Sequence, residues 1–194
     1  DKALYLAKEK GKNRHIIYEE RLHGKLESDD MQNMAMAYAV SKEKKREVIT
    51  KMITELCVSG VNSIVKKEER LQQIRSLFDL DGITIYSESG AQLVCRNGNY
   101  MVEVPDGRGL FEDEKYLALF GDDDNFIESN TLKLRSQDPA AFAVMQKQEI
   151  GAFLQCLSRK EGVPNVIVNY DVFNRNRKWS DEDITLLTIL GHCI

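Results

Sequence analysis

The sequence AFLQCLSRKEGVPNVIVNYDVF at residues 152–173, followed by WSDEDI at 179–184, decides the fold. The first stretch contains two apolar, β-branched runs on either side of a turn at Gly162, which predicts two antiparallel strands joined as a hairpin. In the second stretch, Ser180 precedes three acidic residues and a leucine-rich segment. That arrangement is typical of a capped helix start. The chain is therefore predicted to contain a hairpin followed by a closing helix.

Upstream of this hairpin, the sequence predicts three more short strands, at Ile83–Tyr86, Leu93–Cys95 and Tyr100–Val104. The last two flank Asn97-Gly98, the strongest short hairpin signal in a sequence. A short helix is expected at Glu112–Phe120, and a second begins at Asp138-Pro139, with the aspartate as N-cap and the proline at the first helical position. Strands, an internal helix, a hairpin and a closing helix together predict an α+β domain around a mostly antiparallel sheet.

The residues before these strands have helical periodicity. Apolar side chains recur at intervals of three and four residues over 27–40, 48–56 and 61–78. This spacing indicates amphipathic helices rather than strands. The fold class expected for the whole chain is thus an antiparallel sheet flanked by helices and preceded by a long helical linker.

Composition excludes several classes of function. The net charge of -4 gives no electrostatic footprint for nucleic acid. No apolar run approaches the roughly 20 residues that a membrane-spanning helix needs. The four cysteines have no CxxC spacing, so they are interpreted as free thiols of a cytoplasmic protein. The acidic run Asp122–Asp124 lacks the residue order of a calcium loop, and no metal site is predicted.

The first eighteen residues, DKALYLAKEKGKNRHIIY, closely resemble the C-terminal end of GGDEF domains, the diguanylate cyclases. The resemblance implies that Lys8 and Lys12 approach nucleotide phosphates, and that a full-length parent uses GTP and Mg²⁺ to make cyclic di-GMP. The GG[DE]EF signature itself is absent from the 194 residues. This fragment is therefore expected not to be an enzyme.

From about Val48 onward, the order of elements and the segment Trp179–Ile184 resemble GAF domains, and the related PAS domains remain an alternative. The expected division is a cyclase remnant at 1–24, a helical linker at 25–47 and a GAF-like domain at 48–194. Bilin-binding GAF domains attach their pigment through a cysteine that is commonly followed by histidine. None of the four cysteines is followed by histidine, and no cofactor is predicted.

A ligand pocket, if present, is expected between the sheet and the helix around Phe142 and Met145. The five lining candidates are Tyr86, Phe142, Met145, Gln155 and Tyr170. Filling of the core explains each of these residues equally well.

Two functions follow from these resemblances. The first is a regulatory, sensory module of a bacterial cyclic di-GMP signalling protein, with a possible small-molecule ligand. It would be a homodimer through the helical linker, with Met31, Met34 and Met52 at the seam. The second is a GAF-like dimerisation scaffold that binds no ligand.

Overall fold

A computed structural model describes residues 40, 43–55, 64–88, 92–96 and 107–193 of the chain. The chain divides into two compact units, residues 1–51 and 52–194, and the second unit contains the sheet and its covering helices. Among the described residues, no helix is both long enough and apolar enough to cross a membrane.

Several predicted features lie outside the described residues. They include the cyclase remnant at 1–24 with Lys8 and Lys12, the linker methionines Met31 and Met34, and the strand at Tyr100–Val104. The described residues do include a helix over 43–55, which overlaps the predicted helical segment 48–56. The predicted domain boundaries stay predictions.

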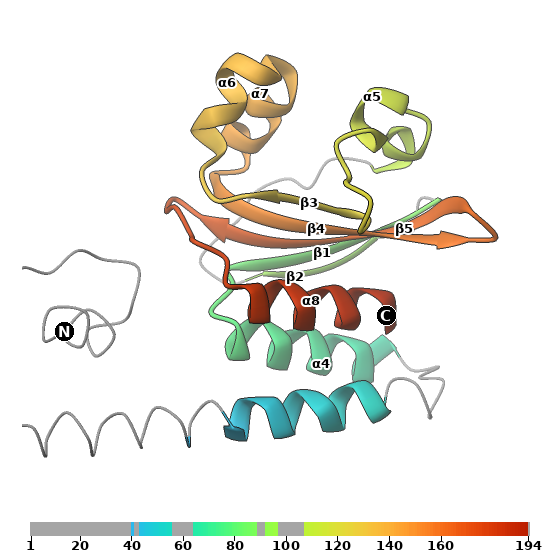
Figure 1. Ribbon diagram of the computed structural model, residues 1–194, viewed down its shortest axis with the longest axis vertical. Coiled ribbons are helices and arrows are strands. Elements are labelled where there is room, and N and C mark those ends of the chain that lie inside the picture. The colour runs from blue at the N-terminus through green and yellow to red at the C-terminus, as the bar shows by residue number, and fades with distance from the viewer. Residues whose placement is uncertain (1–39, 41–42, 56–63, 89–91, 97–106, 194) are drawn as a thin grey trace, which may run out of the picture. The chain divides into compact units, whose positions relative to one another are not determined.

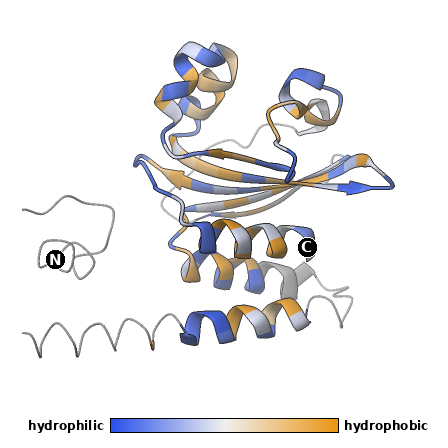
Figure 2. Ribbon diagram, in the orientation of Figure 1, coloured by the Kyte–Doolittle hydropathy of each residue, from blue (hydrophilic) through white to orange (hydrophobic). Residues whose placement is uncertain are grey.

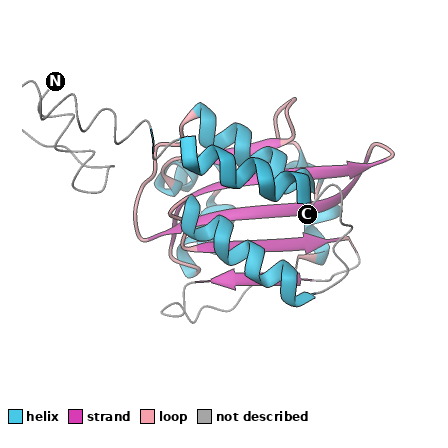
Figure 3. Cartoon of the chain, turned by 90° about the horizontal axis from the view of Figure 1, so that it is seen from below, coloured by secondary structure: helices cyan, strands magenta, loops and turns pink. Residues whose placement is uncertain are grey.

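The second unit is built on one five-stranded antiparallel sheet, which confirms the predicted fold class (Figure 3). The strand order is β2-β1-β5-β4-β3, and every neighbouring pair is antiparallel. The strands are β1 (Gly82–Ser87), β2 (Gln92–Arg96), β3 (Asn125–Glu128), β4 (Ile150–Lys160) and β5 (Val163–Phe173).

Helices cover both faces of this sheet (Figure 1). One face carries the two longer helices, α4 (Ile64–Leu77) and α8 (Asp181–Cys193). The other carries five shorter elements: η1 (Arg108–Phe111), α5 (Glu114–Leu117), η2 (Thr131–Lys133), α6 (Leu134–Gln137) and α7 (Pro139–Lys147).

The β4–β5 hairpin forms as predicted, and its turn explains the register. Lys160 pairs with Val163, which leaves Glu161 and Gly162 as a two-residue loop. Both loop residues have positive φ, 54° and 83°. This is the geometry of a type I′ turn, whose twist matches that of the strands on either side. Local turn chemistry therefore sets the pairing of the two longest strands.

Capping residues fix the starts of α7 and α8. The Asp138 carboxylate accepts hydrogen bonds from the backbone N–H groups of Ala140 and Ala141, at 3.1 and 3.0 Å. Ser180 Oγ accepts from the N–H of Asp183 at 3.1 Å. Both predicted caps are thus confirmed. The acidic first turn of α8 is hydrophilic, in contrast to the apolar turns that follow it (Figure 2).

One strand is not predicted by the sequence pattern. The acidic run Asp122–Asp124 indicates a surface loop, but the residues that follow it, Asn125–Glu128, form β3 and pair with β4. The acidic residues support this edge strand. Asp123 accepts hydrogen bonds from the backbone and side chain of Asn125, and Asp124 pairs with Arg159 at 2.9 Å.

Candidate functional site

A row of buried polar side chains crosses the middle of the sheet. Thr84 on β1 pairs with Asn169 on β5, which pairs in turn with Gln155 on β4. Residues directly opposite each other in antiparallel strands project from the same face, with Cβ atoms about 5 Å apart. All three side chains are buried, with 1%, 7% and 1% of their surface exposed. They form one continuous row over three strands.

A carboxyl group lies beside this row. Asp171 follows Asn169 by two residues on β5, so both side chains project from the same face. It is 1% exposed and lies opposite Gly82 on β1. A Cβ atom at Gly82 would lie 3.0 Å from the Phe173 ring, so the glycine leaves that space to the ring and the carboxyl. We call Thr84, Gln155, Asn169 and Asp171 the polar floor.

Apolar side chains surround the polar floor on the same face. They form one hydrophobic cluster between the sheet and the short helices, with the buried members Tyr86, Phe120, Phe126, Leu134, Met145, Ile150, Phe153, Leu157, Ile167 and Phe173. Its rings make edge-to-face contacts, such as Phe126 with Phe153 at 4.9 Å between centroids. Polar groups in such surroundings are costly unless they are hydrogen-bonded.

Only part of the polar floor is satisfied by the described chain. The Tyr116 hydroxyl on α5 donates to Gln155 Oε1 at 2.9 Å. In contrast, Thr84 Oγ1, Asn169 Oδ1 and Asp171 Oδ1 are buried and have no hydrogen-bond partner within the part of the chain that the structure describes. Buried polar atoms in folded proteins nearly always have a partner, either in the protein or in ordered water. These three atoms therefore mark a candidate position for ordered water or a bound molecule.

The carboxyl of Asp171 is the electrostatic centre of the site. Burial raises its pKa to about 7, because the charged form loses hydration. Arg96 on β2 partly offsets this by attraction, and the negative charge of Asp81 adds to the increase. The Arg96 guanidinium itself donates to Gln148 Oε1 at 3.0 Å and lies 5.3 Å from the Phe173 ring centroid.

The charge of this carboxyl also acts on two tyrosines. Burial raises the pKa of Tyr86 and of Tyr116, and the charge of Asp171 raises both further. Both phenols are therefore protonated at neutral pH. Backbone at Gly107 passes close over Tyr86, since a Cβ atom there would overlap the tyrosine ring. The site thus combines one carboxyl, one guanidinium and two phenols under a cover of backbone and short helices.

The structure brings together four of the five predicted lining residues. Tyr86 and Met145 belong to the hydrophobic cluster, Phe142 packs against it, and Gln155 is part of the polar floor. Tyr170 must be placed differently. It projects from the opposite face, where its hydroxyl donates to the carbonyl oxygen of Leu187 on α8 at 2.9 Å. Whether any of these residues contacts a ligand stays a prediction.

Sequence reasoning missed Thr84, Asn169 and Asp171 as site residues. A signal is nevertheless present in β5, where Asn169 and Asp171 alternate with Val168, Tyr170 and Val172. In a central strand, two polar residues at alternate positions indicate a polar patch on one buried face. The same alternation places Tyr170, the residue predicted from β5, on the other face.

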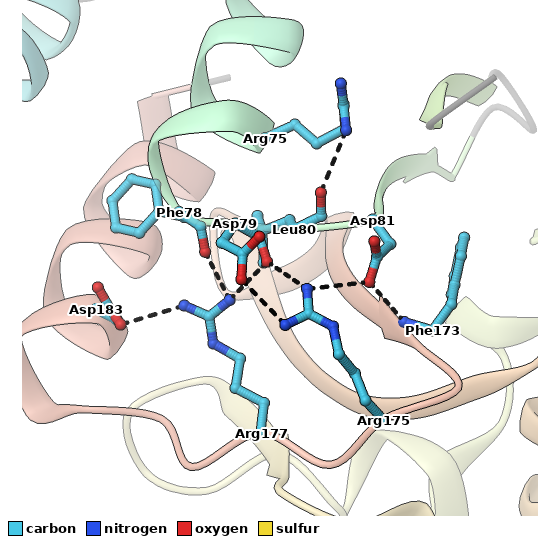
Figure 4. A network of polar contacts seen from close by, with 9 residues as sticks. All are labelled: Arg75, Phe78, Asp79, Leu80, Asp81, Phe173, Arg175, Arg177 and Asp183. Atoms are coloured by element: carbon cyan, nitrogen blue, oxygen red, sulfur yellow. Dashed lines mark hydrogen bonds and ion pairs between the residues drawn. The ribbon is translucent and has the colours of Figure 1, made fainter. Parts of the chain in front are cut away.

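Next to the site, two arginines join the end of α4 to the start of α8 (Figure 4). Arg175 contacts the carboxylates of Asp79 and Asp81 at 3.0 and 3.3 Å. Arg177 donates to the carbonyl oxygens of Phe78 and Asp79 at 2.6 and 3.1 Å. Its other terminal nitrogen binds Asp183 at 3.2 Å. We call Asp79, Asp81, Arg175, Arg177 and Asp183 the arginine latch.

Asp81 connects the arginine latch to the polar floor. Its carboxylate accepts from the backbone N–H of Phe173 at 3.0 Å as well as from Arg175. Its own N–H donates to the carbonyl oxygen of Asp171 at 2.9 Å. The negative charge of Asp81 also raises the pKa of Asp171. A change in the charge of Asp171 therefore changes the electrostatic potential at Asp81, which is part of the arginine latch.

Comparison with known proteins gives matches at the level of structure. No protein-family model matches the sequence, and no curated protein matches it significantly. The chromophore-binding domain of a Stigmatella aurantiaca bacteriophytochrome in the Pr state matches with a TM-score of 0.58 and 13% identity, covering 76% of this chain and 57% of that one. The red/green cyanobacteriochrome NpR6012g4 in its red-light-absorbing state matches with a TM-score of 0.52 and 15% identity, covering 67% and 90%. The photoproduct state of a GAF3 domain from Synechocystis sp. PCC6803 matches with a TM-score of 0.51 and 13% identity, covering 68% and 90%.

The chain has a GAF fold. The resemblance predicted for the second part of the chain is thus confirmed for the fold. Sequence identities of 13–15% support a shared fold and do not assign a ligand to this chain. None of the comparisons supports the predicted resemblance of residues 1–24 to a GGDEF domain.

The three described cysteines lie away from the polar floor. Cys95 pairs with Ile83, so it projects from the α4 and α8 face. Cys156 contacts Leu187 and Thr188 of α8, and burial raises its pKa to about 12. Cys193 is in α8 itself. None of these three thiols is placed to hold a molecule on the floor.

Proposed function

We propose that this GAF domain is a regulatory sensor that binds a small molecule on the polar floor. The observation that carries the proposal is the group of three buried polar atoms on Thr84, Asn169 and Asp171 without partners among the described residues. Each such atom costs about 1–3 kcal/mol when it stays unsatisfied. A molecule that forms hydrogen bonds with these atoms would recover that free energy and stabilise the folded domain.

The arginine latch gives this sensor an output. Asp81 bonds the floor strand β5 on one side and Arg175 on the other. A ligand that changes the charge or position of Asp171 alters the field at Asp81, and through it the link between α4 and α8. A ligand shifts such an equilibrium by as much as it binds the two arrangements differently.

Native mass spectrometry of the purified chain tests the proposal. The wild-type protein is expected to retain a small molecule, and Thr84→Val is expected to lose it because the floor loses a hydroxyl. Thr185→Val is the matched control, since Thr185 is exposed on α8 and its hydroxyl bonds its own helix at Asp181. Retention of the molecule by Thr84→Val, or its absence from the wild-type protein, would contradict the proposal.

A ligand-free dimerisation scaffold is the second candidate function. It is favoured by the rings of Phe120, Phe126 and Phe153, which pack edge to face with one another in the hydrophobic cluster around the floor. In this case, the chain associates through its helical linker and binds nothing. Sedimentation of the protein, with and without its N-terminal linker residues, measures the association independently of ligand.

We also propose that the sensor belongs to a cyclic di-GMP signalling protein. This rests on the motif at residues 1–18, in which Lys8 and Lys12 occupy positions that approach phosphates in GGDEF domains. The parent protein would then convert GTP to cyclic di-GMP with Mg²⁺, while this chain would not. Incubation of both with GTP and Mg²⁺ tests it. Failure of the parent to form cyclic di-GMP would contradict the proposal, and formation by this chain would contradict its catalytic incompleteness.

A further inference from the structure

We infer that the polar floor accepts hydrogen bonds from N–H groups of its ligand. The ligand would be a flat aromatic or heteroaromatic molecule with an amide or amidine edge. The inference rests on the proposed ligand-binding function and adds the chemical class. It follows from which atoms of the floor lack partners, how they are spaced and what surrounds them.

The three unsatisfied atoms of the polar floor are oxygens, and each of them can accept a hydrogen bond. Asn169 Oδ1 can only accept hydrogen bonds, Asp171 Oδ1 can only accept them when its carboxyl is ionised, and Thr84 Oγ1 can accept or donate. A ligand that satisfies all three must therefore present at least two donors. Amide and amidine groups carry N–H donors on a planar frame, whereas carboxylates and phosphates at neutral pH carry acceptors almost exclusively.

The spacing fits a ring-sized molecule. Asn169 and Asp171 are two residues apart on β5, so their Cα atoms are about 6.7 Å apart along the strand. Thr84 lies beside Asn169 at about 5 Å between Cβ atoms. Three acceptors spread over this area are too far apart for a single small ion and suit the edge of a ring with a planar substituent.

The surroundings favour a flat apolar body. Along the strands, the floor is flanked by Tyr86 on β1, Phe153 on β4 and Phe173 on β5, all of which are less than 5% exposed. Aromatic rings pack favourably against one another in stacked or edge-to-face arrangements. The aromatic side chains would bind the faces of the ligand, and the floor would bind its polar edge.

Charge at the site disfavours an anionic ligand. The carboxyl of Asp171 repels an anion when it is ionised, and an anion cannot satisfy Asn169 Oδ1. One terminal nitrogen of Arg96 donates to Gln148, the guanidinium lies over the Phe173 ring, and its charge is attracted to Asp171. A neutral amide or a cationic amidine meets no such repulsion.

Three probes of nearly equal shape test the inference: benzamidine, benzamide and benzoate. Each is titrated at millimolar concentration into the purified chain, and binding is followed by chemical-shift changes of backbone amides on β1 and β5. Benzamidine and benzamide are expected to bind at the floor, and benzoate is not. Because benzoate differs mainly in replacing donors by acceptors, the comparison isolates the hydrogen-bonding edge.

Two floor variants make the test specific. Asp171→Asn is expected to weaken benzamidine binding about tenfold or more, since a bond to a charged acceptor is lost. Asn169→Leu removes the neighbouring acceptor with little change in volume and should weaken benzamide as well. Asp122→Asn, at an exposed position, is the matched control and should bind both probes like the wild-type protein.

The outcomes separate this inference from the function on which it rests. Binding of benzoate without benzamidine or benzamide would overturn the ligand class and leave a ligand-binding sensor. Failure of all three probes, together with another retained molecule in native mass spectrometry, would also overturn the ligand class and leave a ligand-binding sensor. Failure of all three probes with no retained molecule would overturn both, because ordered water would then satisfy the floor.

Discussion

The Tyr116 hydroxyl on α5 donates a 2.9 Å hydrogen bond to Gln155 Oε1 in the middle of β4. This bond ties a helix of only four residues to the centre of the sheet. It satisfies Gln155, whereas Thr84, Asn169 and Asp171 each keep a buried atom without a partner among the described residues. The polar floor therefore has one residue whose buried oxygen has a hydrogen-bond partner and three residues that each keep a buried oxygen without one in the described part of the chain.

Tyr116→Phe is expected to destabilise the protein by about 1–3 kcal/mol, because Gln155 Oε1 then stays buried without a donor. Urea unfolding followed by circular dichroism measures the loss. The double variant Tyr116→Phe/Gln155→Leu removes both partners, so the second substitution should cost less in the Tyr116→Phe background than in the wild-type protein. Strictly additive costs would mean that the bond contributes little.

Arg177→Met is expected to destabilise the protein by about 2–4 kcal/mol, since two carbonyl oxygens and the carboxylate of Asp183 lose a charged donor. Arg159→Met is the matched control. Arg159 also forms a close pair with a carboxylate, but its side chain is 37% exposed, and a solvated pair contributes at most about 1 kcal/mol. Equal losses of unfolding free energy in the two variants would rule out a structural role for the arginine latch.

The Asp171 carboxyl predicts a particular dependence of stability on pH. Its pKa is raised by burial from 3.8 to about 7, so between these values the folded chain holds a proton that the unfolded chain has released. The free energy of unfolding must then fall as pH rises through this window and level off above it. Asp171→Asn should remove this part of the slope, whereas an unchanged slope would place the pKa of Asp171 near its ordinary value.

Gly162→Ala is expected to cost about 1 kcal/mol or more, because the residue has a φ of 83° in the β4–β5 turn and alanine is strained there. Gly109→Ala is the control, since a Cβ atom at Gly109 would meet nothing within 4 Å and its φ is not positive. Thermal unfolding of both variants gives the comparison. A loss at Gly109 as large as that at Gly162 would argue against the type I′ turn.

Much of the fold could be predicted because its signals are local. The turn at Gly162 and the caps Asp138 and Ser180 depend on residues within three positions of one another. The strand β3 could not be predicted in this way. Its four residues follow an acidic run, and only pairing with β4, some thirty residues later in the chain, makes them a strand.

The site was predicted less completely than the fold, and for a different physical reason. Alternation along β5 shows that Asn169 and Asp171 share a face and that Tyr170 takes the other. It does not show which face meets the short helices. The register with β1 and β4, together with the contact of Tyr170 with α8, decides that question. Those contacts join distant parts of the chain, and no local pattern records them.

The arginine latch also bears on the order in which the chain folds. Its contact between Asp79 and Arg175 joins residues 96 positions apart. Closing so long a loop before the sheet exists would cost more entropy than one ion pair returns. The latch should therefore form after the transition state, so that Arg177→Met speeds unfolding and leaves the refolding rate nearly unchanged. In this domain the last contacts to form would be the ones that govern how long the folded state survives.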